Sequence, residues 1–358
     1  MKGYFKAGIK ALLLAAALAS LLVGCNDSLD PIFYTLEQEK PIRDTGLENQ
    51  ITVRKLARAV VGTVKDYFAA AGQIFRRSEG STSWSRVSPP EPNLLCNMIE
   101  FVPGPPETLY AGFFELDGTP RGVWSSSPTP PIDWTQEGGG LPNDAQAVLL
   151  KVVNSVLFAA ILKGTACTLY HNDTGAPGAW AKAAISLSPS VTITDIAWNS
   201  STTAYWLTAG NKLYTSADAD WIFTEAGSQP TSDMLAGIIY NGTNLYVASK
   251  GGRVYSSADG SAWNPSAKVE ASGKTVPFTE FAQVGTDLWV GSEGYGYFLL
   301  SDGGLAGLEN SRSPNYNISD LYNGAILSFL VDGTSVFACT AGAGLWRTDD
   351  DGSTWGRE

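Results

Sequence analysis

A short motif recurs seven times along this 358-residue chain at an almost constant spacing. Each copy pairs an aromatic with a preceding apolar residue, and most copies add an acid about four positions later and then a Trp. The aromatics are 41 to 49 residues apart, at Phe75, Trp124, Tyr170, Tyr214, Tyr255, Phe298 and Trp346. A period of roughly 40–50 residues built from short apolar runs and Gly-rich turns is typical of β-propellers and related arrays. The spacing therefore constrains the architecture strongly, and it says little about a ligand.

The fifth and seventh copies show the repeating unit most clearly. Each has three strand-like runs separated by Gly-containing turn signals: residues 236–242, 244–249 and 253–257, and residues 327–333, 335–339 and 344–348. In the fifth copy Trp263 begins a fourth, outer strand. The sequence thus predicts an all-β chain, a seven-bladed β-propeller of four-stranded antiparallel blades over residues 51–358. Six or eight blades also fit, because one copy is degenerate and its blade could be miscounted.

The first copy allows two interpretations. Taken alone, residues 53–61 place Leu56, Ala57, Val60 and Val61 on one face of a helix. Residues 67–75, however, match the second and third strands of the other copies almost position for position. The register of the repeat should override the local helical preference, so we assign residues 53–61 to a strand.

The N-terminus has the features of an export signal. Three lysines precede an apolar run at residues 11–23, which is too short to span a bilayer. The run ends in Gly24-Cys25, which resembles the lipobox of bacterial lipoproteins, although an ordinary signal peptide with a chance Cys also fits. The resemblance implies a signal peptide at residues 1–24, acylation of Cys25, and a lipid-anchored tether at residues 25–50. Asn26 resembles an outer-membrane sorting signal.

The composition agrees with an exported binding protein and excludes several classes of site. The net charge is −11, and removal of residues 1–24 leaves 21 basic against 35 acidic residues, which disfavours nucleic acid as a partner. We interpret Cys96, Cys167 and Cys339 as small buried apolar residues, with one disulfide an open alternative. His171 is the only histidine, so neither a histidine-based metal site nor a Ser-His-Asp triad can form. No metal or other cofactor is predicted.

The recurring acid and Trp resemble the Asp-box, or BNR-like, repeat of sialidase-type and other propellers. The residues that match it are Ser257, Asp259, Gly260 and Trp263 in the fifth copy, and Thr348, Asp350, Gly352 and Trp355 in the seventh. A hydroxyl and a carboxylate two residues apart suit a tight turn, where Gly takes a positive φ and Trp covers the turn. Because the acid recurs in most copies, we predict a structural role for it rather than a catalytic or Ca²⁺-binding one.

Sialidase activity is disfavoured. That family requires an arginine triad and a Phe/Tyr-Arg-Ile-Pro motif, and the chain has only the non-equivalent Pro41-Ile42-Arg43-Asp44. Other glycosidases with such repeats combine two propellers, and this chain has room for one. A hydrolase with two carboxylates remains open, but no pair stands out, so no catalytic residue is predicted.

The turns between the second and third strands should converge on one rim, where propellers commonly bind ligands. The candidate rim residues are Glu115, Asp117, Lys163, Asn211, Lys250, Glu293 and Tyr295. They differ in kind between copies, as expected of positions that the fold does not dictate. Residues 303–323 break the sixth copy, as a lid, a partner-binding loop or a degenerate blade edge.

The sequence thus favours an exported, lipid-anchored propeller that acts as a protein-binding or assembly scaffold in the cell envelope, with the outer membrane favoured. A resemblance to the photosystem assembly factor with Asp-box-like repeats supports this class by analogy of fold. An envelope glycan-processing hydrolase, which would need a convergent carboxylate pair with raised pKa values near the axis, and a surface adhesin are the alternatives. Finally, the chain stops soon after Trp355, which predicts a last blade with almost no outer strand and an unpaired edge. We expect residues 31–36 to supply it by pairing with the strand of Trp346.

Overall fold

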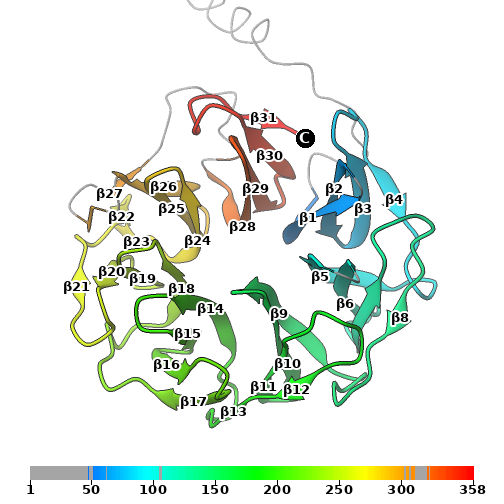
Figure 1. Cartoon of the computed structure of the whole chain (residues 1–358). Helices are drawn as coiled ribbons and strands as arrows, with labels where there is room; N and C mark the ends of the chain where they lie inside the picture. The colour runs from blue at the N-terminus through cyan, green and yellow to red at the C-terminus, as the bar shows by residue number, and fades with distance from the viewer. Residues whose placement is uncertain are drawn as a thin grey trace, which may run out of the picture. The chain divides into compact units, whose positions relative to one another are not determined.

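The computed structural model describes residue 47 and residues 51–358, apart from residues 62, 105–106, 302–303, 306–307, 311–320 and 322. The described residues belong to one compact unit. Within it the described residues form seven four-stranded antiparallel sheets arranged around one axis, as Figure 1 shows. The predicted seven-bladed β-propeller is confirmed.

In each blade the strands run in chain order from the centre of the ring outwards. The first blade comprises β1 (Lys55–Val61), β2 (Val64–Ala71), β3 (Gln73–Ser78) and β4 (Ser85–Val87), and the second comprises β5 (Leu95–Val102), β6 (Thr108–Phe114), β7 (Pro120–Ser126) and β8 (Thr135–Gln136). The third blade comprises β9 (Gln146–Val153), β10 (Val156–Lys163), β11 (Ala166–Asn172) and β12 (Ala181–Lys182). The fourth comprises β14 (Ile193–Asn199), β15 (Ala204–Ala209), β16 (Lys212–Ala217) and β17 (Ile222–Glu225). The remaining blades comprise β18 (Leu235–Tyr240), β19 (Leu245–Ser249), β20 (Val254–Ser257) and β21 (Asn264–Pro265); β24 (Phe278–Val284), β25 (Asp287–Ser292), β26 (Tyr297–Leu300) and β27 (Leu308–Asn310); β28 (Ala325–Asp332), β29 (Ser335–Ala341), β30 (Leu345–Thr348) and β31 (Gly356–Arg357).

Three short strands lie outside this pattern. β13 (Ala184–Ile185) pairs in parallel with β17 and adds a fifth strand to the fourth blade. β22 (Glu270–Ala271) and β23 (Lys274–Thr275) form a small hairpin between the fifth and sixth blades. Neither addition disturbs the four-strand unit.

The repeat predicted the strand register correctly. All seven recurring aromatics lie on the third strand of a blade, in β3, β7, β11, β16, β20, β26 and β30. The first copy also follows the repeat, because β1 is a strand over most of residues 53–61. The repeat therefore overrides the local helical pattern there.

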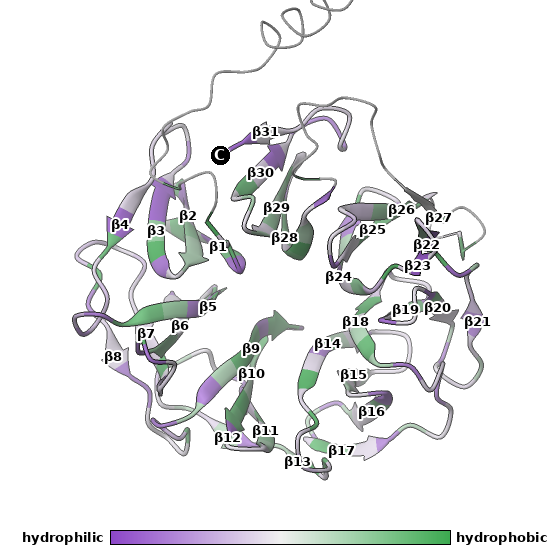
Figure 2. Ribbon diagram, turned by 180° about the vertical axis from the view of Figure 1, so that it is seen from behind, coloured by the Kyte–Doolittle hydropathy of each residue, from purple (hydrophilic) through white to green (hydrophobic). Residues whose placement is uncertain are grey.

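The core is a ring between the blades rather than a single central cluster. Every residue of β19 is buried, because both faces of a second strand pack against neighbouring blades and the usual alternation of apolar and polar residues is lost. Figure 2 shows this for β10, which is apolar along most of its length. Cys96, Cys167 and Cys339 are free and buried, as predicted for small apolar residues.

The seventh blade is complete without a borrowed strand. Arg357 pairs with Trp346 and Gly356 with Arg347, so β31 occupies the outer edge of β30 while β29 occupies the inner edge. The prediction that the edge of β30 is unpaired and needs a strand from elsewhere is therefore wrong, because the two residues of β31 occupy that edge. Residues 31–36, to which we assigned that position, lie outside the described residues.

The chain closes the ring with residues just before β1. The amide of Val53 donates to the Thr340 carbonyl (3.0 Å), and the amide of Gly344 donates to the Ile51 carbonyl (3.0 Å). Leu47 is buried and belongs to an apolar cluster shared by the first and seventh blades. These contacts place backbone hydrogen bonds and apolar packing at the junction between the two ends of the repeat array.

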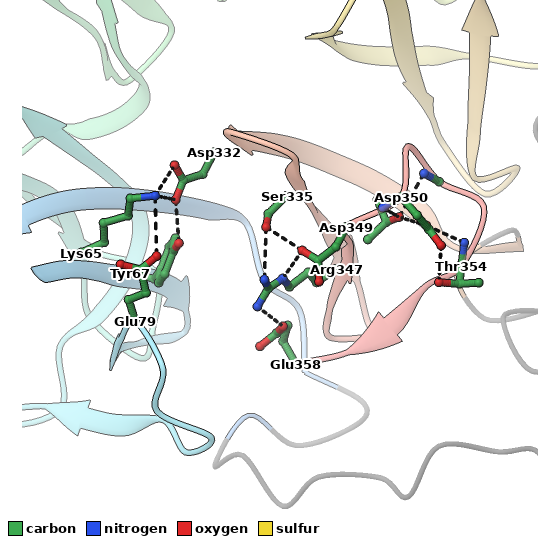
Figure 3. Close-up of polar contacts among 12 residues, drawn as sticks. Lys65, Tyr67, Glu79, Asp332, Ser335, Arg347, Asp349, Asp350, Thr354 and Glu358 are labelled. Atoms are coloured by element: carbon green, nitrogen blue, oxygen red, sulfur yellow. Dashed lines mark hydrogen bonds and ion pairs between the residues drawn. The ribbon is translucent and has the colours of Figure 1, made fainter.

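Ionic contacts reinforce the same junction (Figure 3). Asp332 of β28 accepts hydrogen bonds from Tyr67 (2.6 Å), Arg58 (2.6 Å) and Lys65 (3.1 Å), all of which belong to the first blade. Burial tends to raise the pKa of Asp332, but these three donors outweigh burial and hold the pKa below its usual range. One nearly buried carboxylate thus joins the seventh blade to three side chains of the first.

The segment that interrupts the sixth copy is partly described. Residues 308–310 form β27, the outer strand of the sixth blade, which agrees with the interpretation of a blade edge. Residues 302–303, 306–307, 311–320 and 322 lie outside the described residues. The alternatives of a lid or a partner-binding loop remain predictions for that portion.

Candidate binding site

The turns between second and third strands lie at one end of the propeller, next to the connections between blades. The Lys250 amide donates to the Met234 carbonyl (2.8 Å), and the Glu293 amide donates to the Pro277 carbonyl (2.9 Å). Met234 and Pro277 lie in the connections that lead into β18 and β24. We call this end of the propeller the rim face.

The candidate rim residues do not meet at one point. Lys250 and Glu293, on the turns of the fifth and sixth blades, form an ion pair across the blade boundary (2.5 Å). Glu115 pairs with Arg121 (2.8 Å), and Lys163 pairs with Asp144 (2.7 Å). The other three bond locally, in contacts that involve Asp117 with Thr119, Asn211 with Ser232, and Tyr295 with Ser292. The rim is a series of separate polar contacts, and of its predicted residues only Lys250 and Glu293 are brought together.

Two large apolar side chains are exposed on this face. Leu116, at the tip of the expanded turn of the second blade, is 72% exposed, and Met234, between the fourth and fifth blades, is 54% exposed. Exposed apolar side chains surrounded by paired charges are common in surfaces that contact other proteins. The rim face therefore offers apolar contact points as well as charges.

A second charged group lies at the centre of the ring, on the innermost strands. The strand registers make seven positions equivalent, one in each blade: Lys55, Met98, Leu149, Asp195, Gly237, Glu280 and Ser328. Two residues further along the inner strands lie Glu100 of β5 and Lys151 of β9. We call Lys55, Glu100, Lys151, Asp195 and Glu280 the axial cluster.

Four members of the axial cluster form two ion pairs between adjacent blades. Lys55 pairs with Glu100 (2.8 Å) and also donates to the Leu150 carbonyl of the third blade. Lys151 pairs with Asp195 (2.5 Å), which also accepts a hydrogen bond from the Ile238 amide of the fifth blade (3.0 Å). Burial works to lower the pKa of Lys151, but Asp195, Glu280 and Glu100 together raise it. Both lysines are thus committed to acidic neighbours.

Glu280 is the fifth member, and it forms no hydrogen bond or ion pair with any described residue. Burial is the main reason that the pKa of Glu280 is raised to about 7; Asp195 and Glu100 raise it further, while Lys151 and Lys55 oppose them. The equivalent position of the preceding blade is Gly237, where a Cβ would lie 2.6 Å from the Thr279 carbonyl oxygen. The close approach of these two strands therefore excludes a side chain that could pair with Glu280.

Solvent reaches this centre, since the side chains of Lys55, Glu100 and Lys151 remain 16%, 18% and 24% exposed. The cluster also lies toward the rim face. Lys55 pairs in the sheet with Ala70 and Asp195 with Thr208, each within two residues of the turn at that end. The rim and the axial cluster thus belong to one end of the molecule.

The sequence interpretation missed the axial cluster, although a signal was present. Glu100, Lys151, Asp195 and Glu280 are each the single charged residue of a mainly apolar inner strand, as in VLLKVV around Lys151 and FTEFAQV around Glu280, whereas Lys55 begins β1, which also contains Arg58. A charge in such a position has to face solvent or a partner at the axis. The apolar neighbours of each charge are typical of a core strand, and the charges come together only when the inner strands of all the blades are compared.

The Asp-box residues make local turn contacts. Asp350 accepts hydrogen bonds from the Thr348 hydroxyl (2.7 Å), the Thr354 amide (2.8 Å) and the Thr354 hydroxyl (2.7 Å), as Figure 3 shows in part. Asp259 accepts bonds from the amide (2.9 Å) and the hydroxyl (2.7 Å) of Ser261. Gly352 and Gly260 have positive φ values of 83° and 81°. The structural role of these acids stays a prediction for mutation to test.

These turns also contact the preceding blade. A Cβ at Gly260 would collide with the Trp206 ring of the fourth blade, and one at Gly352 would lie 2.5 Å from the Tyr297 hydroxyl of the sixth. Trp355 is buried, and its indole donates to the same Tyr297 hydroxyl (3.1 Å). Trp263 of the fifth blade, in contrast, is only partly buried.

Other site classes find no support in the described part of the chain. It contains no group of three or more His, Cys, Asp or Glu residues arranged to hold a metal ion. No helix in it is long and apolar enough to cross a membrane. Cys25, the predicted lipidation site, lies outside the described residues.

Comparisons with known proteins agree on the fold. The family model of the DUF6242 beta propeller domain matches residues 131–288, from the second blade to the sixth. A search of the curated proteins finds no match. The family match and the topology both identify a propeller.

Solved structures resemble the chain at low sequence identity. YCF48 bound to D1 peptide is 12% identical, with a TM-score of 0.58 over 84% of this chain and 92% of that chain. A chain of the mitotic checkpoint complex is also 12% identical, with a TM-score of 0.58 over 85% and 95%. The extracellular domain of the hybrid two-component system BT4673 from B. thetaiotaomicron is 15% identical, with a TM-score of 0.55 over 76% of this chain and 34% of that chain. At these identities the likeness shows the fold alone.

Proposed function

We propose that this chain is a lipid-anchored envelope protein whose propeller binds a protein partner at the rim face. The observation that carries the proposal is the combination, on the rim face, of exposed apolar side chains with charged turns that vary between blades. Leu116 and Met234 are the exposed apolar side chains, and the Lys250–Glu293 pair lies on two of the turns. Val64 and Val331 are exposed at the other end, where the Asp-box turns are filled with contacts to their own residues and to the preceding blade.

The solved neighbours support a protein partner by analogy only. One is YCF48 bound to D1 peptide, and another belongs to the mitotic checkpoint complex. Propellers with unrelated sequences serve many functions, so we infer the class of partner from the surface of this chain. That surface combines apolar contact points with an axial charge that its neighbours do not neutralise.

The anchor is supported by the sequence. The apolar run at residues 11–23 and Gly24-Cys25 together suit a lipoprotein signal, and acyl chains on Cys25 would hold the propeller at a membrane. Asn26 favours the outer membrane. The acidic balance of the chain disfavours nucleic acid as the partner.

A glycan-processing hydrolase is the second candidate, because Glu280 has the raised pKa expected of a general acid near the axis. Such a reaction needs a second carboxylate that is available to the substrate. Asp195 is held by Lys151 and the Ile238 amide, and Glu100 by Lys55, so both acids beside Glu280 are already engaged. This engagement favours binding over hydrolysis.

Site-specific photo-crosslinking in intact cells tests the proposal. A photoreactive amino acid at Leu116 or Met234 should yield a discrete protein adduct, because both side chains are exposed on the rim face. Val64 is 47% exposed at the turn between β1 and β2, at the other end of the propeller, and serves as the matched control without an adduct. Adducts only from Val64 would contradict the proposal, and sugar release from envelope glycans that Glu280→Gln abolishes would favour the hydrolase.

A further inference from the structure

We propose that Glu280 is the anchor of a site for a single cationic group, such as the guanidinium or ammonium group of a partner's side chain, at the centre of the ring. This inference rests on the proposed function, because it names the chemistry that the rim face recognises. The juxtaposition behind it is an acidic side chain without an ion pair of its own beside two ion pairs that each join a lysine to another acid.

The axial cluster contains two lysines and three acids. Lys55 and Glu100 form one pair, and Lys151 and Asp195 form another. Glu280 has no such partner among the described residues, so an ionised Glu280 leaves the cluster with one uncompensated negative charge. Lys151 and Lys55 offset the cost of ionising the partly buried Glu280 only in part, and a cation supplied from outside would remove the rest of the penalty.

Neither neighbouring blade supplies a hydrogen-bond partner for Glu280 at the equivalent position. The equivalent positions of the neighbouring blades are Gly237 and Ser328. Gly237 offers no side chain, and the Ser328 hydroxyl already donates to the Arg54 carbonyl (2.9 Å). The polar groups beside Glu280 on these two strands therefore leave its carboxylate available to a ligand.

The axial cluster favours an organic cation as ligand over an anion or a metal ion. An anion would have to attract Lys55 or Lys151 away from an acidic partner, which makes an anion site unfavourable. A metal ion usually requires several oxygen ligands, and no suitable group of three acids occurs in the described part of the chain. A guanidinium or ammonium group needs one carboxylate with good geometry, which Glu280 supplies.

Cation binding at Glu280 should depend on the protonation state of its carboxyl group. Glu280 faces Lys151 on β9, Asp195 on β14, Lys55 on β1 and Glu100 on β5, and it also influences Cys339 on β29. With its pKa raised to about 7, Glu280 is mainly protonated at pH 6 and mainly ionised at pH 8. Binding of a cation requires the ionised form, so the affinity should rise about tenfold between these pH values.

Calorimetry with defined probes tests the inference on the full propeller. Acetyl-Gly-Arg-Gly-amide is the cationic probe, and the same peptide with citrulline in place of Arg is its uncharged control. Agmatine carries the cationic groups without a peptide backbone. The expected result is binding of the Arg peptide that strengthens about tenfold from pH 6 to pH 8, with no binding of the citrulline peptide. Agmatine binding as tight as that of the Arg peptide would identify small amines as the ligand, and weaker binding would identify a partner's side chain.

Variants connect the binding to Glu280. Glu280→Gln should weaken the Arg peptide at pH 8 by at least about tenfold and remove the pH dependence. Glu107→Gln, at an exposed carboxylate before β6, should leave both unchanged. A ¹³C titration of the wild-type carboxyl groups gives a readout that needs no variant, because the Arg peptide should lower the pKa of Glu280.

Equal binding of the two peptides, or unchanged binding by a folded Glu280→Gln variant, would overturn the inference. So would the absence of any detectable binding of the cationic probes. These results would leave the rim-face adducts from Leu116 and Met234 intact, so that failure of the cation site can be told apart from failure of the proposed function.

Discussion

Arg77 of the first blade and Glu358 of the seventh form a buried ion pair across the closure of the ring. Their side chains are 4% and 6% exposed, and the Arg77 guanidinium lies over the rings of Trp84 and Tyr67. The Glu358 amide donates to the Leu345 carbonyl (2.9 Å), which fixes the residue beside β30. The pair lies at the only blade junction that two distant ends of the chain have to form.

Loss of this pair should destabilise the propeller. Glu358→Gln removes a carboxylate from the buried Arg77 guanidinium and should cost about 2–4 kcal/mol in the free energy of unfolding, measured with denaturant. Glu225→Gln, in the exposed pair with Lys212, is the matched control and should have little effect. If Glu358→Gln and the double variant with Arg77→Met both unfold like the wild type, the pair does not secure the closure.

The two Asp-box acids should differ in their effect on stability. Asp350→Ala removes three hydrogen bonds and should cost about 1–2 kcal/mol, whereas Asp259→Ala removes two bonds from one exposed serine and should lower the melting temperature less. Calorimetric melting curves give the order. Crosslinking from Met234 should stay unchanged in both variants, and a variant that melts normally but loses its adduct would show a functional acid.

The two Asp-box tryptophans should also differ. Trp355→Ala removes a buried ring and its bond to Tyr297, and should cost about 3–5 kcal/mol. Trp263 is only partly buried and its indole nitrogen has no hydrogen-bond partner in the described structure, so Trp263→Ala should cost clearly less. Equal losses in denaturant unfolding would contradict the burial described for the two turns.

Glu280 should make stability depend on pH. Because its pKa is raised in the folded state, the folded protein binds more protons than the unfolded chain between about pH 4.5 and pH 7, and Glu280 costs stability as the pH rises through this window. Glu280→Gln should therefore raise the melting temperature by a few degrees at pH 8 and by little at pH 5. A constant difference across this range would show that Glu280 titrates normally.

Cys25 should carry the lipid. Cys25→Ser removes the sulfur that would be acylated, so the variant should move from the detergent phase to the aqueous phase when cells are extracted and the phases separated. Glu107→Gln serves as a control that should stay with the wild type. If Cys25→Ser remains in the detergent phase, the chain is attached in another way.

The fold was predictable because one signal repeats seven times. Aromatics such as Tyr214 and Tyr255 fix the third strand of each blade, and the period then fixes the other strands, even where residues 53–61 favour a helix locally. The outer strand of the last blade was missed because β31 has only two residues, too few to show a pattern. The axial cluster was missed because ion pairs such as Lys151–Asp195 depend on the angle between blades, which the sequence does not encode locally.

The central claim is that the rim face, with its axial cluster, is the end of the propeller that binds a partner. The most direct test is hydrogen–deuterium exchange on the propeller in complex with the partner that crosslinking identifies, after that partner has been purified. The account predicts protection at the turns that contain Leu116 and Lys250 and at the inner-strand segments around Asp195 and Glu280. The turn at Val64, at the other end, should exchange as in the free protein. Protection confined to the end with Val64, and unchanged exchange at the rim turns, would contradict the account.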